Sequence, residues 1–192
     1  MRLALLPFLL LCVGGCRPRE ASTPTEAHAR LVAALAAHDG TLLWDALDQD
    51  TRWSWMTIQR AWRECYDITH SVVPEGPERT RLLARFEPGA TSENAKALFA
   101  RMLSTEDWTR AKALVTAAGS RLPELRLPGE SSEIATPVGP LVYRKGRGRS
   151  AGWGYAGLAG LADQLKFAAS ADLERMRRDA ADYERAATRG AR

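Results

Sequence analysis

The densest group of cationic side chains lies in one short, glycine-rich segment. Its four cations within six positions are Arg144, Lys145, Arg147 and Arg149. Glycines between arginines allow backbone amides and guanidinium groups to converge on a phosphate or another anion. The segment is therefore a candidate anion-binding site for an anionic polymer or a lipid headgroup. The alternative interpretation is a solvated hairpin loop in which the glycines serve the turn.

Two aromatic residues closely follow this basic segment. Trp153 and Tyr155 stand at positions i and i+2, which places them on the same face of a strand. Exposed, they would stack on a sugar or a peptide. Buried, they would be the sheet's contribution to the core, covered by the final helix of the chain. We predict that they are buried.

Of the three cysteines of the sequence, Cys65 is the candidate nucleophile. It shares an apolar stripe at helical spacing with Ile58 and Trp62, and a thiol in such surroundings is buried rather than reactive. We therefore do not pair it with His70 as a catalytic base. An intermolecular disulfide is the alternative to burial.

The same region holds the best arrangement of metal-binding residue types. Glu64, Asp67 and His70 recur at positions i, i+3 and i+6. Metal sites need imidazole or carboxylate groups that converge within a few ångströms, and no second histidine stands at ligand spacing. We predict no metal site, no cofactor and no catalytic residue.

The elements that position these side chains are mostly helical. Apolar residues at helical spacing predict helices over 26–38, 42–47, 50–68, 78–86, 92–103 and 105–118. The expected N-caps of three of these helices are Thr41, Ser92 and Thr105, and Gly40 is suited to a left-handed position.

From position 132 onward the pattern changes to short strands. Runs at 133–136, 140–145 and 152–156 predict a small antiparallel meander near 132–156. A final apolar stripe from Leu158 to Ala187 has a period of about 3.6 residues, typical of a straight helix rather than a coiled coil. The predicted fold class is α+β and predominantly α-helical, with a long C-terminal amphipathic helix.

The first sixteen residues, MRLALLPFLLLCVGGC, combine an arginine, an apolar run and a small-residue ending. The run is shorter than the roughly 20 residues of a membrane span and is typical of an export signal. Val13-Gly14-Gly15-Cys16 resembles the lipobox of bacterial lipoproteins, which implies cleavage before Cys16 and lipidation of its thiol. The predicted organisation is a signal peptide over 1–15, a tether over 16–25 and a single globular domain over 26–192.

A second resemblance covers residues 29–47. The segment ARLVAALAAHDG from Ala29 to Gly40, followed by LWDAL from Leu43 to Leu47, resembles the opening helices of NTF2-like domains. This resemblance implies helices leading into a curved sheet, with a small-ligand pocket or, less often, an enzyme site. We transfer no pocket residue from it.

Together these patterns predict a lipid-anchored cell-envelope protein that faces the periplasm and acts as a non-enzymatic binding or scaffolding module. Its partners would be the membrane, through the N-terminal lipid, and an anionic envelope component or a protein. The net charge of +4 permits contact with anionic lipid, and we predict no nucleic-acid partner. Arg17, in place of the aspartate that resembles an inner-membrane retention signal, favours the outer membrane.

Two alternatives stay open. One is an NTF2-like small-ligand-binding protein or enzyme. The other is a structural lipoprotein that acts through the arginine-rich end of its final helix, which would project beyond the body; these residues are Arg175, Arg177, Arg178, Arg185 and Arg189.

Overall fold

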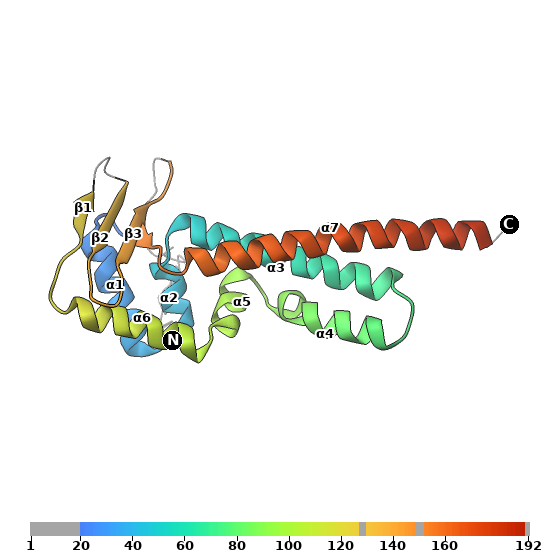
Figure 1. Ribbon diagram of the computed structural model, residues 1–192, viewed down its shortest axis with the longest axis horizontal. Coiled ribbons are helices and arrows are strands. Elements are labelled where there is room, and N and C mark those ends of the chain that lie inside the picture. Colours follow the sequence, from blue (N-terminus) through green and yellow to red (C-terminus); the bar gives the residue numbers. More distant parts are fainter. Residues whose placement is uncertain (1–19, 127–129, 149–151, 191–192) are drawn as a thin grey trace, which may run out of the picture.

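The computed structural model describes residues 20–126, 130–148 and 152–190 and has the predicted α+β, predominantly helical fold (Figure 1). The helices are α1 (Pro24–Ala37), α2 (Gly40–Ala46), α3 (Gln49–Val72), α4 (Pro77–Thr91), α5 (Ala95–Met102), α6 (Thr105–Ala118) and α7 (Ala159–Gly190). The strands are β1 (Glu124–Arg126), β2 (Ser131–Ile134), β3 (Leu141–Lys145) and β4 (Trp153–Tyr155). The predicted signal peptide, Cys16 and Arg149 lie outside the described residues.

The first two helices begin earlier than predicted because their caps lie earlier in the chain. The side chain of Thr23 caps α1, so the helix takes in the end of the predicted tether. Asp39, and not the predicted Thr41, caps α2 with its carboxylate. The left-handed residue between the two helices is His38, with φ of 52°, rather than Gly40. At the start of both helices, a side-chain oxygen therefore accepts hydrogen bonds from backbone N–H groups that have no partner within the helix.

The caps of α5 and α6 also differ from the prediction. Asn94 caps α5 in place of Ser92, because its amide oxygen accepts a backbone N–H of the first turn. Ser104 caps α6 in place of Thr105, and it forms a reciprocal capping box with Asp107. In each case a neighbouring residue of equal capping ability takes the position.

Helix α4 continues beyond its predicted end at Phe86. It runs through Pro88 to Thr91. Gly89 allows α4 to cross α3 closely, since a Cβ at this position would lie 2.4 Å from the Cβ of Trp62. The contact with α3 therefore holds a segment that a proline would otherwise interrupt.

The four strands form an antiparallel meander in the order β1-β2-β3-β4, of which β1 was not predicted. Trp153 and Tyr155 are buried, at 8% and 1% exposure, which confirms the prediction for this pair. The prediction that the final helix covers this pair was wrong, because α1 and α6 contact the sheet while α7 lies along α3. Tyr143 of β3 lies opposite Tyr155 and donates to, or accepts from, the buried His28 of α1 at 2.6 Å.

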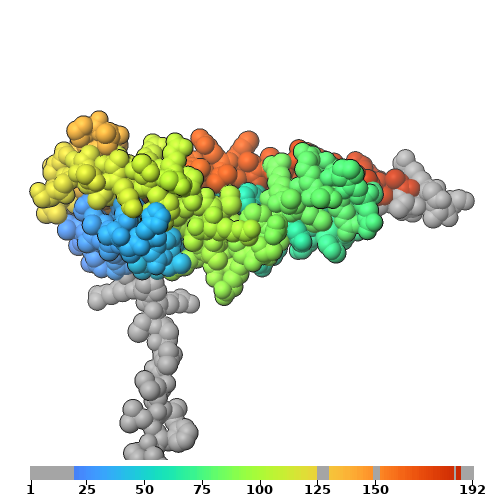
Figure 2. Space-filling model, turned by 90° about the horizontal axis from the view of Figure 1, so that it is seen from below, coloured from blue at the N-terminus to red at the C-terminus, as the bar shows by residue number. Residues whose placement is uncertain are grey.

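Helices α3 and α7 run side by side in the same direction and give the molecule an elongated form (Figures 1 and 2). With 32 residues, α7 extends about 48 Å at 1.5 Å per residue. A main core lies between the sheet and α1, α2, α5 and α6, and it also includes buried residues of α3 and α7, such as Trp55, Ile58 and Ala162. A second, smaller core lies between α3, α4 and α7, and its buried residues are Cys65, Val73, Leu82, Phe86 and Met176. The burial predicted for Cys65 is thus confirmed.

Within the described ranges, no helix combines the length and the apolar character that crossing a membrane would require.

Candidate functional site

The basic segment and the start of α3 face each other across a cleft of about 750 Å³. The residues that line it come from the start of α3, the start of β2 and the β3–β4 hairpin: Asp48, Gln49, Asp50, Glu130, Ser131, Arg144, Lys145, Gly146, Arg147 and Gly148. A second hollow of about 350 Å³ adjoins it toward α7 and shares Arg144, Arg147 and Asp50. The structure therefore brings together Arg144, Lys145 and Arg147, while Arg149 lies outside the described residues.

The hairpin that carries these cations is held by backbone hydrogen bonds. The N–H of Gly146 donates to the carbonyl oxygen of Gly152 at 2.9 Å across the hairpin. The N–H of Arg147 donates to Oε1 of Gln49 at 2.7 Å, which ties the loop to the first turn of α3. Gly148 has φ of 101°, a conformation that favours glycine. Gly148 therefore serves the turn, as one interpretation of the sequence predicted. The turn positions Arg144, Lys145 and Arg147.

Asp48 is the buried carboxylate beneath this hairpin, and it is only 2% exposed. Its Oδ1 caps α3 by accepting the N–H of Thr51 at 3.0 Å, and its own N–H donates to the carbonyl oxygen of Tyr155 at 3.0 Å. Its Oδ2 makes no hydrogen bond with the described residues and lies 3.9 Å from Nη1 of Arg144. Burial raises the pKa of Asp48, although Thr51 and the charge of Arg144 oppose the shift.

Sequence reasoning missed Asp48, because the third helix was predicted to start at position 50. The signal was present as a capping residue directly before the apolar stripe. Its burial, however, depends on strand β4. A Cβ on Gly154 would lie 2.4 Å from the backbone nitrogen of Asp48, so β4 passes against the α2–α3 junction and excludes water from it.

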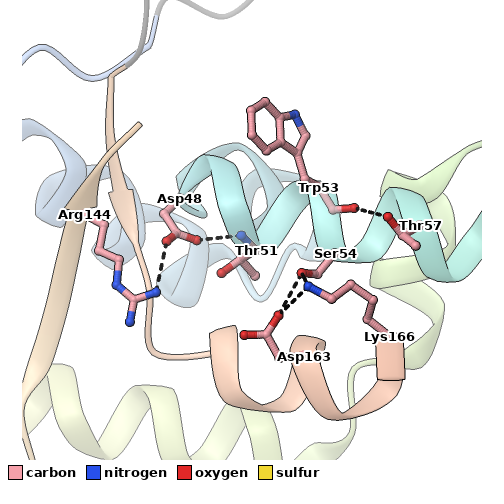
Figure 3. A network of polar contacts seen from close by, with 8 residues as sticks. All are labelled: Asp48, Thr51, Trp53, Ser54, Thr57, Arg144, Asp163 and Lys166. Atoms are coloured by element: carbon pink, nitrogen blue, oxygen red, sulfur yellow. Dashed lines mark hydrogen bonds and ion pairs between the residues drawn. The ribbon is translucent and has the colours of Figure 1, made fainter. Parts of the chain in front are cut away.

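A polar network joins α3 to the start of α7 beside the cleft (Figure 3). The hydroxyl of Ser54 donates to Oδ1 of Asp163 at 3.0 Å, and Nζ of Lys166 donates to the same oxygen at 3.0 Å. The hydrogen bond from Lys166, then that from Ser54, lowers the pKa of Asp163. Trp53 points away from this network and is 50% exposed.

The charges of the cleft are therefore mixed rather than uniformly basic. Asp163 is engaged by Lys166, and Asp48 lies buried beneath Arg144. Asp50 and Glu130 are exposed and line the same cleft as the hairpin cations. Such a site matches a ligand with a phosphate and an amine better than it matches a bare anion.

Two short motif matches overlap the hairpin, and sequence reasoning missed both. Residues 148–152 read GRSAG, a match to GxSxG, and residues 152–157 read GWGYAG, a match to GxGxxG. A nucleophile elbow joins a strand to a helix, whereas this segment joins two antiparallel strands. A dinucleotide motif lies between a strand and a helix, whereas here Trp153–Tyr155 is itself the strand. Two of its glycines serve packing: a Cβ on Gly157 would meet the Tyr155 hydroxyl at 2.1 Å, and Gly154 adjoins Asp48.

The weaker candidates from the sequence are used in packing and ion pairs. Burial raises the pKa of the Cys65 thiol to about 12, so the thiolate form is disfavoured. Glu64 pairs with Arg177 at 2.6 Å, and His70 stacks on Tyr66 with ring centroids 6.5 Å apart. Over the part of the chain that the structure describes, no group of three His, Cys, Asp or Glu side chains could hold a metal ion.

Several arginines of α7 are likewise paired. Arg175 bonds to Asp172, Arg177 to Glu64, and Arg185 to Asp182. The side chain of Arg189 lies outside the described residues. These pairs reduce the positive charge that the end of α7 offers to a partner.

The NTF2-like alternative requires a pocket between the helices and the sheet. Leu141, Tyr143 and Tyr155 on that face of the sheet are at most 1% exposed, and Leu31 of α1 is fully buried. The cleft described above lies instead at one end of strands β2 and β3, beside the hairpin. No family model matches this chain, and neither a curated protein nor a solved structure matches it.

Proposed function

We propose that this chain is a lipid-anchored protein of the bacterial cell envelope that binds a phosphate-bearing ligand without catalysing a reaction. The resemblance of residues 13–16 to a lipobox supports the anchor. The observation that carries the binding role is the cleft in which Arg144 and Arg147 face the first turn of α3. The NTF2-like resemblance remains an alternative that no contact described above favours.

The two arginines supply the recognition chemistry. A guanidinium presents paired N–H donors that match two oxygens of a phosphate. Arg144 is 49% exposed, so its donors reach the cleft, while Asp48 beneath it limits its orientations. A side chain held from below binds with less loss of conformational entropy than a free one.

The exposed carboxylates define the rest of the ligand. Asp50 and Glu130 line the cleft with the arginines and would repel a ligand of purely negative charge. An amine beside the phosphate would pair with them. The ligand class that fits the cleft best is therefore a phosphoester carrying an ammonium group, such as phosphoethanolamine.

Calorimetric titration of residues 17–192 with O-phosphoethanolamine and with inorganic phosphate tests the binding role. We expect tighter binding of O-phosphoethanolamine, and a loss of about 10- to 100-fold in Arg144→Ala, since a hydrogen bond to a charged group contributes about 1.5–3 kcal/mol.

The matched control is Arg81→Ala, which removes an arginine that is 71% exposed on α4 and paired with Glu78. Equal losses in the two variants, or no binding of either compound, would contradict the proposed role.

The anchor has its own test. In Cys16→Ser the thiol that receives the lipid is absent, so we expect an unlipidated precursor that retains residues 1–15. Mass spectrometry of the product measures this directly. A processed, membrane-extracted product in that variant would refute the anchor.

A further inference from the structure

The first described residues attach firmly to the edge of the cleft. Oε1 of Glu20 lies 2.8 Å from Nη2 of Arg52, in the first turn of α3. The carbonyl oxygen of Ala21 accepts the N–H of Trp153 at 2.8 Å, so Ala21 extends the sheet beside β4. A Cβ on Gly152 would lie 2.5 Å from the Cβ of Glu20. The chain therefore leaves the domain between α3 and the base of the basic hairpin.

This attachment limits how far the domain can lie from a lipid on Cys16. Three residues lie between Cys16 and Glu20. Over these four residue steps an extended chain covers at most roughly 3.6 Å per step, or about 14 Å in all. The tether is thus shorter than the 16–25 segment that the sequence suggests. The surface around Glu20 must remain near the headgroup layer.

The side chains around that surface have the composition of a membrane interface. Trp53 is 50% exposed and Met56 is 51% exposed, one helical turn apart on α3. Trp53 lines the second hollow together with Arg144 and Arg147. Indole rings favour the headgroup level, and arginines attract anionic lipid.

We propose that this surface, defined by Trp53, Met56, Arg144, Lys145 and Arg147, docks on the bilayer that holds the lipid anchor. The occupant is the headgroup layer of that membrane, because the tether is short and leaves the domain beside this surface, and because the cations of the surface complement the phosphate groups of lipid headgroups. The proposal rests on the proposed lipid anchor. It makes the phosphate-bearing ligand of the cleft a lipid headgroup rather than a free metabolite.

In this orientation the opposite end of the sheet faces away from the membrane. The β2–β3 turn lies at the other end of the strands from the β3–β4 hairpin (Figure 1). Val138 in that turn is 61% exposed. It provides a control position that the docked protein keeps out of the bilayer.

The test uses the full mature lipoprotein, checked for its lipid by mass spectrometry. It is reconstituted in vesicles of equimolar phosphatidylethanolamine and phosphatidylglycerol that carry bromine near the headgroup end of their acyl chains. Bromine quenches a tryptophan that reaches it. We expect quenching in the wild type and loss of most of it in Trp53→Phe, because Trp53 is exposed whereas the other five tryptophans are buried or half-buried.

The control variant is the double substitution Trp53→Phe with Val138→Trp, which moves the reporter to the far end of the sheet. We expect it to remain as weakly quenched as Trp53→Phe alone. Recovery of quenching in the double variant, or unchanged quenching in Trp53→Phe, would overturn the docked orientation while leaving the anchor intact. A native product without lipid on Cys16 would overturn the anchor and this inference with it.

Discussion

The substitution Asp48→Asn separates the two roles of the buried carboxylate, and Asp48→Ala is its partner variant. Asparagine keeps an oxygen that caps α3 through the N–H of Thr51, whereas alanine removes it. Losing such a cap costs about 1 kcal/mol. For a domain of this size, about 1 kcal/mol corresponds to roughly 2–4 °C in Tm. We therefore expect Asp48→Ala to be less stable than Asp48→Asn by that amount.

The charge of Asp48 sets the pH dependence of the comparison with wild type. Burial raises the pKa of Asp48 in the folded protein, so the folded state binds this proton more tightly than the unfolded state does. This tighter proton binding stabilises the folded protein at low pH. The stabilisation is lost as pH rises from the unfolded pKa of about 3.9 through the folded pKa. Asparagine avoids the cost of burying an ionised carboxylate. At pH 7, Asp48→Asn should be at least as stable as wild type, and its advantage should disappear near pH 3.9 and below.

Urea unfolding followed by tryptophan fluorescence measures these differences at both pH values. The opposing term is the ion pair with Arg144, which is 49% exposed and 3.9 Å away, and pairs of this kind contribute about 0–1 kcal/mol. If Asp48→Asn is destabilised at pH 7 as much as Asp48→Ala, then the charge itself stabilises the fold and the reasoning from burial is wrong.

The remaining predictions probe the fold. Gly154→Ala should destabilise the domain by at least about 1–3 kcal/mol, because the new Cβ would meet the backbone of Leu47 and Asp48. The control is Gly160→Ala, since nothing lies within 4 Å of a Cβ at that position. Equal denaturation midpoints for the two variants would contradict the close packing of β4. Tyr143→Phe should cost about 1–3 kcal/mol because it leaves the buried His28 unpaired. Burial lowers the pKa of His28 in the folded protein, so the unfolded chain binds this proton more tightly. Wild-type stability should therefore fall as pH drops through about 6.5. A melting temperature that does not change with pH in this range would show that His28 does not contribute to the pH dependence. Cys65 should react with a thiol reagent only in urea, and rapid labelling of the native protein would show that the second core opens.

The helices could be predicted because each carries a continuous apolar stripe. The stripe of α3 placed Cys65 in the interior, where it lies fully buried. Strand β1 was missed because it has only three residues and gains its order by pairing with β2. Helix α7 was predicted to cover the sheet, since a stripe shows that a helix is buried but not against which partner. That choice depends on tertiary packing.

The cations of the site could be predicted, whereas the cleft could not. Arg144 and Arg147 stand out in the sequence because of their composition. Their neighbour Gln49 lies 98 positions from Arg147, and nothing in a local pattern relates the two segments. Asp48 looks like an ordinary capping residue until Gly154 of β4 covers it. The buried charge is thus a product of the fold.

The side-by-side packing of α3 and α7 determines when folding can finish. It joins Glu64 to Arg177 across 113 positions, so a chain that emerges N-terminus first presents α3 long before its companion helix exists. Until then the apolar stripe around Cys65 has no complete cover, and contacts so distant in sequence form slowly. For a chain exported as proposed, this order of events delays closure of the second core until nearly all of the polypeptide has been made. If the chain is exported as we propose, the late arrival of the final helix would help to keep the precursor unfolded during its passage across the membrane.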